Sequence, residues 1–366
     1  MDFTFTEEQQ AAAEAARGVF AQVAPDTVPS PALNRDAVAE DFDRALWRRL
    51  AAADVLGLTV PGGQGGAGLG PIAWCLALRE AGQVLARVPL LETGAAALTL
   101  GRYGDPWRLL PRIARGEVAL TVAAEGRTGH GPAELAVLAR PLDDAAWALD
   151  GLHTAVPWAG CVDAVLLPAH TSEGRAVLAV VEPAADGVTL AGQVSTSGEA
   201  LAELRLDQVR AERVLTAGGA WAWLRAVLAT GVCALALGAG TAALRMTAEY
   251  TGKREQFGHP LATFQAVAMQ AADRYVDLLA MEATLWQAAW RLESGPAPAE
   301  VAVAKVWAAE GVRRVLATAQ HLHGGFGADV TYALHRYHAW AKQLELALGP
   351  AAAWEEELGD CLAAEQ

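Results

Sequence analysis

The pattern of apolar residues changes twice along the chain, and these changes limit the folds that the chain can adopt. Residues 117–209 contain short alternating apolar runs separated by turn residues, which is typical of a β-barrel or β-sandwich. The segments on either side are rich in alanine, the best helix former. The sequence therefore predicts a mostly α protein with a central β domain: residues 1–116 form a helical domain, residues 117–210 the β domain, and residues 211–366 a helical bundle.

Individual elements follow from the same patterns. The predicted strands are Val118–Val122, Leu135–Leu138, Ala164–Leu167, Val177–Val181 and Leu201–Leu206, with turns at Asp150-Gly151, Glu173-Gly174 and Asp186-Gly187. The predicted C-terminal helices are Ala220–Tyr250, Phe264–Leu292, Pro298–His323, Val330–Leu348 and Pro350–Leu362. Near the N-terminus, Thr6 and Gln9 predict a capping box at the start of a helix that runs through Phe20.

Charge and composition narrow the classes of function. A net charge of −14 over 366 residues argues against general binding to nucleic acid or anionic lipid, although a few arginines can still hold an anionic cofactor. The four cysteines are scattered without a CxxC pair, and the acidic start has no signal-peptide pattern, so a reduced, cytoplasmic chain is expected. Residues 220–244 come nearest to a membrane span, but Arg225 and several glycines interrupt them, which favours a buried core helix.

A glycine-rich stretch offers a dinucleotide-binding interpretation. Gly63, Gly65 and Gly68 match G-x-G-x-x-G. However, Pro61 precedes them, no βαβ unit surrounds them, and residues 73–86 continue as helix rather than as a second strand. The sequence therefore does not predict a Rossmann fold.

Two stretches of the C-terminal region have both a structural and a functional interpretation. In the string from Tyr250 to Gln265, the cations Lys253 and Arg254 suit the last turn of a helix, which Gly258 and Pro260 would close. In residues 321–325, His-Leu-His-Gly-Gly, the glycines are ordinary residues after a helix end. These interpretations explain the basic pair, the glycines and the proline, but they leave the strings as a whole unexplained.

Metal sites and hydrolase motifs are not indicated. His321 and His323 are two residues apart and do not share a helix face. His335 and His338 could share a face, but no third ligand lies near them in the sequence. The sequence also contains no G-x-S-x-G, no Walker lysine loop and no H-E-x-x-H.

Three strings together resemble the acyl-CoA dehydrogenase family. The first is Tyr-x3-Arg-x2-Phe-Gly-x5-Phe-Gln at residues 250–265. The second is Val-Pro with the following glycines and leucine at residues 60–69, similar to V-P-E-x-x-G-G-x-G-L. The third is residues 321–325, similar to Q-L-H-G-G with His321 in place of the glutamine. The resemblance extends over essentially the whole chain.

The resemblance implies a site for FAD that is shared between subunits. It implies that Arg254 reaches the pyrophosphate of a neighbouring subunit's FAD, which suits the planar, permanently charged guanidinium. The other implied FAD-binding residues are Gln256, Phe257, Phe264, Gln265, His321, His323, Gly324 and Gly325. It also implies an acyl-CoA substrate and an electron-transfer flavoprotein as electron acceptor.

The flavin pocket and the catalytic base of the family are altered. Residues 123–130 lack the proline and serine of T-E-P-x-A-G-S-D, residues 151–153 end in His153, and Pro157-Trp158-Ala159 replaces an aromatic and hydroxyl pair. The two family positions for the base fall at Leu348 and near Leu228. Because leucine cannot accept a proton, we assign no catalytic residue; Glu345, one turn before Leu348, remains an alternative if the register slips.

This combination resembles the partner subunits of actinobacterial heterotetrameric (α2β2) acyl-CoA dehydrogenases that shorten steroid side chains. It implies a second acyl-CoA dehydrogenase subunit that carries the base and most of the flavin site. Two alternatives remain at this point. One is a complete homotetrameric dehydrogenase that uses an unrecognised acid, and the other is a helical scaffold that kept the fold and lost the chemistry.

Overall fold

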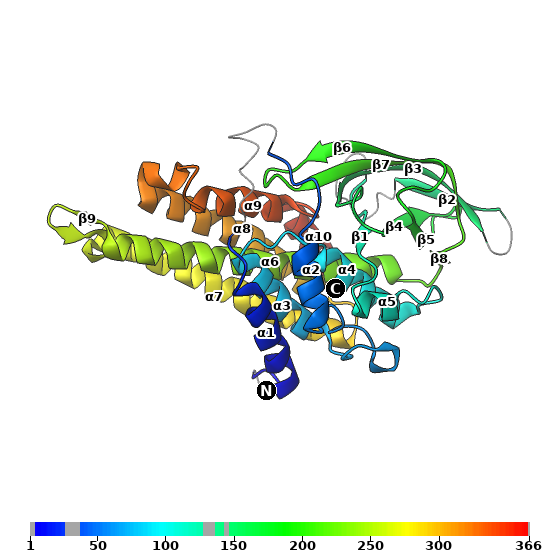
Figure 1. Cartoon of the computed structure of the whole chain (residues 1–366), viewed down its shortest axis with the longest axis horizontal. Coiled ribbons are helices and arrows are strands. Elements are labelled where there is room, and N and C mark those ends of the chain that lie inside the picture. Colours follow the sequence, from blue (N-terminus) through cyan, green and yellow to red (C-terminus); the bar gives the residue numbers. More distant parts are fainter. Residues whose placement is uncertain (1–3, 26–36, 127–135, 143–145, 365–366) are drawn as a thin grey trace.

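The chain folds into two helical regions with a β domain between them, and this confirms the predicted fold class (Figure 1). The computed structural model describes residues 4–25, 37–126, 136–142 and 146–364. The N-terminal region contains α1 (Glu7–Phe20), α2 (Arg44–Ala52), the 3₁₀ helix η1 (Gly62–Gln64), α3 (Pro71–Gln83), α4 (Leu90–Tyr103) and α5 (Leu110–Ala114). The capping box of α1 forms as predicted, with Thr6 and Gln9 exchanging hydrogen bonds.

The β domain is one eight-stranded sheet with the order β6-β7-β3-β2-β4-β5-β8, and β1 pairs with β4. Its strands are β1 (Leu120–Val122), β2 (Val137–Pro141), β3 (Trp147–Pro157), β4 (Ala164–His170), β5 (Ala176–Val181), β6 (Val188–Val194), β7 (Ala200–Ala211) and β8 (Val214–Leu215). Most pairings are antiparallel, whereas β4 runs parallel to β1 and β2. The domain boundaries after residues 116 and 210 remain our proposal.

Three strands of the sheet were not predicted, and one predicted turn is wrong. Asp150 and Gly151 lie inside β3, where they pair with Leu138 and Val137 of β2. The register between β3 and β7 shifts at this point, which is a β-bulge, and Gly151 has φ 147° with the Ala136 backbone packed against it. Glycine is required there because a Cβ would lie 2.2 Å from the Ala136 carbonyl oxygen. The other unpredicted strands of the sheet are β6 and the two-residue β8.

The C-terminal region is a helical bundle built around α6. Its elements are α6 (Ala220–Lys253), β9 (Glu255–Gln256), β10 (His259–Pro260), the 3₁₀ helix η2 (Leu261–Thr263), α7 (Gln265–Ser294), α8 (Pro298–His323), the 3₁₀ helix η3 (Gly324–Ala328), α9 (Leu334–Leu346) and α10 (Ala351–Ala364). The prediction for α8 is confirmed at both ends. The helix predicted from Val330 begins only at Leu334, since residues 329–333 form turns.

Helix α6 passes a membrane-span test by length and composition, but it is a core helix here. Within the described residues, 83% of its most apolar 18-residue window is buried. It crosses α3 closely at two glycines, where a Cβ on Gly82 would lie 2.3 Å from the Leu235 carbonyl oxygen and one on Gly238 2.1 Å from the Arg79 carbonyl oxygen. The close crossing therefore depends on residues without side chains.

The structure also settles two local alternatives. Residues 55–90, all of them described, contain helices and turns without a strand, so the G-x-G-x-x-G match is not part of a dinucleotide-binding fold. The helix-cap interpretation expects Gly258 to close α6, but Gly258 does not do so. Instead it follows Phe257 in the two-residue turn of the β9–β10 hairpin, and both residues have positive φ, 56° and 82°.

Two hydrophobic cores hold the molecule together. The larger core joins both helical regions and includes the side chains of β1, β4 and β5 that face the helices, such as Leu120, Leu166 and Val180. The smaller core lies within the β domain and includes Val137, Leu149 and Leu204. The β domain is therefore fixed to the helices along one face of its sheet, and one of the two candidate sites lies at this junction.

Candidate functional site

The β9–β10 hairpin presents Arg254 at the end of α6. Arg254 is the C-cap residue of that helix, and its backbone N–H donates to the Tyr250 carbonyl at 2.8 Å. Its own carbonyl accepts from the Leu261 N–H at 2.8 Å, which closes the hairpin at its base. The hairpin lies at the end of the bundle far from the sheet (Figure 1).

The side chains of this hairpin are exposed to solvent. Arg254 is exposed, and its guanidinium makes no ion pair or hydrogen bond with any residue that the structure describes. Phe257 is 91% exposed and meets the ring of Phe264 edge-on, with 6.4 Å between centroids. Gln256 and Gln265 are exposed on either side of them. A bare phenyl ring beside a free guanidinium suits an interface with an anionic ligand.

The diglycine turn lies beside the hairpin. Tyr250, one helical turn before Arg254, stacks on His323 with 4.4 Å between ring centroids. Gly324 has φ 59°, both it and Gly325 are exposed, and no heavy atom lies within 4 Å of an added Cβ at either position. The structure thus brings the two sequence strings together and leaves open space over the glycine backbone.

The two histidines of this turn differ in environment. His323 is buried; its Nδ1 lies 2.8 Å from the Ala319 carbonyl and its Nε2 lies 3.1 Å from the Tyr332 hydroxyl. Burial lowers the pKa of His323 below its ordinary value, so the ring is neutral at pH 7. His321 is exposed, and its Nδ1 lies 3.1 Å from Oε1 of Gln270 on α7. Within the described part of the chain, no three His, Cys, Asp or Glu side chains form a metal-binding group.

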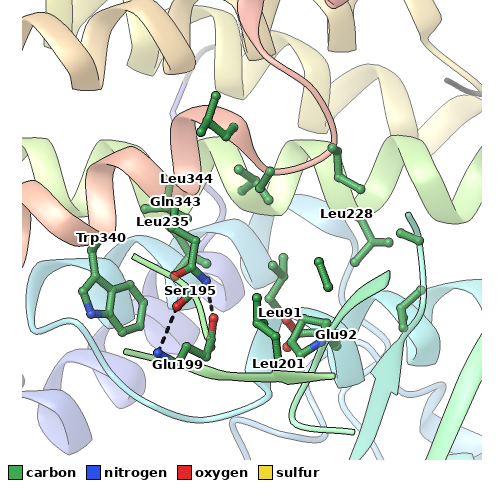
Figure 2. Close-up of a pocket in the computed structure, with 18 of the residues that line it drawn as sticks. Leu91, Glu92, Ser195, Glu199, Leu201, Leu228, Leu235, Trp340, Gln343 and Leu344 are labelled. Carbon is green, nitrogen blue, oxygen red and sulfur yellow. Dashed lines mark hydrogen bonds between the residues drawn. The ribbon is translucent and has the colours of Figure 1, made fainter. Parts of the chain in front are cut away.

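A second candidate site is a cavity of about 380 Å³ between the β domain and the helices. Both sequence positions assigned to the catalytic base line it. Leu348 comes from the turn after α9. Leu228 comes from α6 (Figure 2). The two positions reached by counting along the sequence thus lie at one cavity in the structure. In this chain, that place is lined by two side chains that cannot transfer a proton.

Several hydrogen bonds fix the turn that carries Leu348, although the Leu348 side chain cannot transfer a proton. Leu348 has φ 58°, a conformation that is uncommon for a branched residue. Its N–H donates to Glu125 Oε1 at 3.2 Å, and its carbonyl accepts from Trp354 Nε1 at 3.0 Å. Fully buried Lys305 donates from Nζ to the carbonyls of Glu345 and Gly349, each at 3.1 Å. Burial lowers the pKa of Lys305 to about 8.

Glu345 is not positioned to replace the missing base. Its carboxylate pairs with Nζ of Lys342 at 2.6 Å, and its side chain is 14% exposed, so it is less solvated than a helix-surface charge. The residues on either side, Leu344 and Leu346, line the cavity, whereas Glu345 does not. The backbone carbonyl of Glu345 therefore binds Lys305, and its carboxylate binds Lys342.

The stretches in which the sequence departs from the family pattern lie partly in the cavity wall and partly in the core. Ala155 and Pro157 of β3 line the cavity. Trp158 is 1% exposed, has φ 56°, and packs edge-on against Phe42 in the core. His153 is buried between the carbonyls of Glu125 and Pro168. The altered family stretch at residues 123–130 is described only through residue 126.

Sequence reasoning missed two acids that line this cavity, Glu92 and Glu199. Glu92 is 7% exposed, and burial, with a smaller contribution from Glu199, raises its pKa to about 8. Glu199 accepts a hydrogen bond from Nε2 of Gln343 (Figure 2). One signal was available for Glu92: it is the single charged residue in the apolar segment from Leu90 to Leu100.

The two candidate sites of one chain are too far apart to bind the same atoms of a ligand. Arg254 follows Leu235, the last α6 residue that lines the cavity, by nineteen positions of one continuous helix. At about 1.5 Å rise per residue, this is about 29 Å, which far exceeds the reach of an arginine side chain. Arg254 therefore lies out of reach of this chain's own cavity.

Comparison with known proteins identifies the class of protein. The acyl-CoA dehydrogenase N-terminal domain family matches residues 6–117, and the acyl-CoA dehydrogenase C-terminal domain family matches residues 226–354. The chain belongs to the acyl-CoA dehydrogenase family. Members of this family are flavin-dependent oxidoreductases that act on a CH–CH bond, and their cofactor is FAD.

Particular relatives cover the whole chain. The acyl-CoA dehydrogenase FadE27 of Mycobacterium tuberculosis is 36% identical, over 99% of each chain, and FadE28 of the same organism is 30% identical, over 95% of each. Among solved structures, a variant of the Tcur3481–Tcur3483 steroid acyl-CoA dehydrogenase is similar with a TM-score of 0.89, 38% identity and 98% of each chain covered. The ChsE4–ChsE5 complex from Mycobacterium tuberculosis is similar with a TM-score of 0.89, 36% identity and 99% of each chain covered.

Proposed function

We propose that this chain is the subunit of a hetero-oligomeric, FAD-dependent acyl-CoA dehydrogenase that completes the FAD site of a second, base-carrying subunit. One observation carries the proposal. The cavity where the base is expected is lined by Leu228 and Leu348, whereas Arg254 is free and exposed about 29 Å further along α6. This chain therefore lacks what its own cavity needs and offers what another subunit's site needs.

The residues at the hairpin end fit the diphosphate of FAD. The guanidinium of Arg254 can donate two parallel hydrogen bonds to phosphate oxygens. Gly324 and Gly325 leave their backbone accessible, since neither has a Cβ and the space beside them is open. Phe257 offers an exposed ring and Gln265 an amide donor. Phe264 supports Phe257, Gln256 and His321 are exposed around them, and buried His323 stacks on Tyr250 beneath the turn.

When bound, FAD supplies the hydride acceptor for α,β-dehydrogenation of the acyl-CoA thioester. In our proposal, this chain contributes no proton transfer, because neither leucine can act as a base. Its contribution is to bind the diphosphate and to cover the cofactor with the exposed hairpin. We further propose an α2β2 assembly, a steroid side-chain CoA as substrate, an electron-transfer flavoprotein as acceptor, and a cytoplasmic location. The steroid class is supported by the similarity to a steroid acyl-CoA dehydrogenase.

Purification with and without a partner tests this proposal. The chain is expressed alone and together with a second acyl-CoA dehydrogenase that carries an acid at a base position, and bound FAD is measured by visible absorbance. We expect a colourless chain alone and a yellow hetero-oligomer after co-expression. A yellow homotetramer with turnover would instead identify a complete dehydrogenase. A chain that stays colourless with every candidate partner would identify a scaffold.

A further inference from the structure

Glu92 occupies an unusual position for a carboxyl group. It lies in the first turn of α4 and lines the cavity between the β domain and the helices. In Figure 2 it lies among the apolar side chains of Leu91, Leu201 and Leu228. Because the residue is only 7% exposed, water reaches it almost solely through the cavity.

The other charged groups of the cavity have partners, and Glu92 lacks one. Glu125 accepts from the N–H of Leu348, Glu199 accepts from Gln343, and Lys342 pairs with Glu345. Within the described residues, the carboxyl of Glu92 forms no ion pair, and its hydrogen bond is with its own backbone N–H. A buried polar group without a partner destabilises the folded state, so the carboxyl of Glu92 in the cavity calls for a ligand that satisfies it.

The protonation state of Glu92 limits the chemistry of that ligand. Burial and the nearby carboxyl of Glu199 raise the pKa of Glu92 to about 8, so it is a neutral acid at pH 7. A neutral carboxyl donates one hydrogen bond through its O–H, and it attracts neither a cation nor an anion. The volume of about 380 Å³ is within the usual range for a small-molecule pocket.

We propose that this cavity binds an uncharged, mostly apolar molecule that carries a ketone or hydroxyl oxygen, and that Glu92 donates a hydrogen bond to this oxygen. The apolar walls, including Leu228, Val232 and Leu235 of α6, bind the hydrocarbon part. Glu92 then determines specificity, because a hydrocarbon without oxygen leaves the buried acid unsatisfied. The inference concerns this chain's own cavity and does not depend on the proposed role of Arg254.

The test compares two probes of equal shape, the steroid ketone androstanone and the hydrocarbon androstane, by equilibrium dialysis against the full-length chain at pH 7. We expect the wild type to bind androstanone about tenfold more tightly than androstane, as about 1.4 kcal/mol implies. Glu92→Leu should remove this preference by weakening androstanone binding alone. Glu92→Gln, which keeps an N–H donor, should retain the preference within about threefold.

The pH dependence separates hydrogen bonding from simple packing. Between pH 7 and pH 9 the wild type should lose its preference for the ketone, because the ionised carboxylate of Glu92 has no proton to donate. Glu92→Gln should keep its preference for the ketone between pH 7 and pH 9. The other charged groups that line the cavity, Glu125, Glu199 and Lys342, are still present in that variant, so it controls for their effect. Absence of androstanone binding to the wild type, or an unchanged preference in Glu92→Leu, would overturn the proposal.

Discussion

Glu92 should make the protein less stable as the pH rises from 5 to 8. Its pKa is raised from an ordinary value of 4.5 to about 8 in the folded state, with burial as the main cause. Between these two values the unfolded chain has released the proton and the folded chain still holds it. The folded state therefore binds more protons, and the free energy of unfolding falls with increasing pH across this window.

The size of the effect follows from the two pKa values. One pKa unit corresponds to about 1.36 kcal/mol, so the full window of about 3.5 units corresponds to almost 5 kcal/mol. Between pH 5.0 and pH 7.5 the unfolding free energy of the wild type should fall by about 3 kcal/mol relative to Glu92→Gln, whose amide does not titrate. At pH 7.5 the variant should thus be the more stable protein.

Urea denaturation of both proteins at pH 5.0 and pH 7.5 measures this difference directly. The matched control is Glu14→Gln, since Glu14 is exposed on α1, and we expect it to leave the pH dependence of the wild type unchanged. If Glu92→Gln and the wild type lose or gain stability in parallel between the two pH values, the carboxyl of Glu92 is ionised in the folded state. The burial argument would then be refuted.

Three further predictions concern the fold and the absent base. Glu345→Gln should leave the activity of the reconstituted complex nearly unchanged, because the Glu345 carboxylate pairs with Lys342 and does not line the cavity; a loss of about a hundredfold would show that it acts as a base. Trp158→Ala should lower the free energy of unfolding by about 3–5 kcal/mol and leave FAD retention of the complex unaltered, which urea denaturation and absorbance can check. Gly238→Ala should destabilise by about 1–3 kcal/mol because its Cβ meets the α3 backbone, whereas Gly252→Ala, in open space on the same helix, should be neutral or stabilising in the same assay.

The fold was largely predictable because local patterns and tertiary packing agree. Proline at the start of α8 and glycine after its end specify both ends of that helix, and both were predicted. Strand β3 was missed because Asp150-Gly151 has the composition of a turn, while the sheet accommodates it as a bulge. The turn at Gly258 was misassigned for a related reason, since glycine serves helix ends and hairpins equally well.

The candidate site was predictable where it depends on position along one element. Leu228 and Leu348 were located by counting from family motifs, and the structure places both beside one cavity. The burial of Glu92 and the influence of Glu199 on it were not predictable, because tertiary packing brings α4 and the segment before β7 to the same cavity. Likewise, only the continuous length of α6 shows that Arg254 cannot reach its own chain's cavity.

The central claim is that Arg254 binds the diphosphate of FAD held mainly by a partner subunit. A hydrogen bond to a charged group contributes about 1.5–3 kcal/mol, so Arg254→Ala should weaken FAD retention in the complex by about ten- to a hundredfold. Arg254→Lys should restore only part of the loss, because an ammonium cannot make the bidentate contact. The matched control is Lys253→Ala, which removes an exposed cation from the same helix end.

The decisive measurement is the release of FAD on dilution of the co-purified complex, with thermal melting to confirm that each variant is folded. We expect faster release and weaker binding of FAD for Arg254→Ala, an intermediate result for Arg254→Lys, and wild-type retention for Lys253→Ala. If the complex with Arg254→Ala retains FAD as tightly as the wild type, Arg254 only caps α6, and the proposed FAD site across the subunit boundary is contradicted.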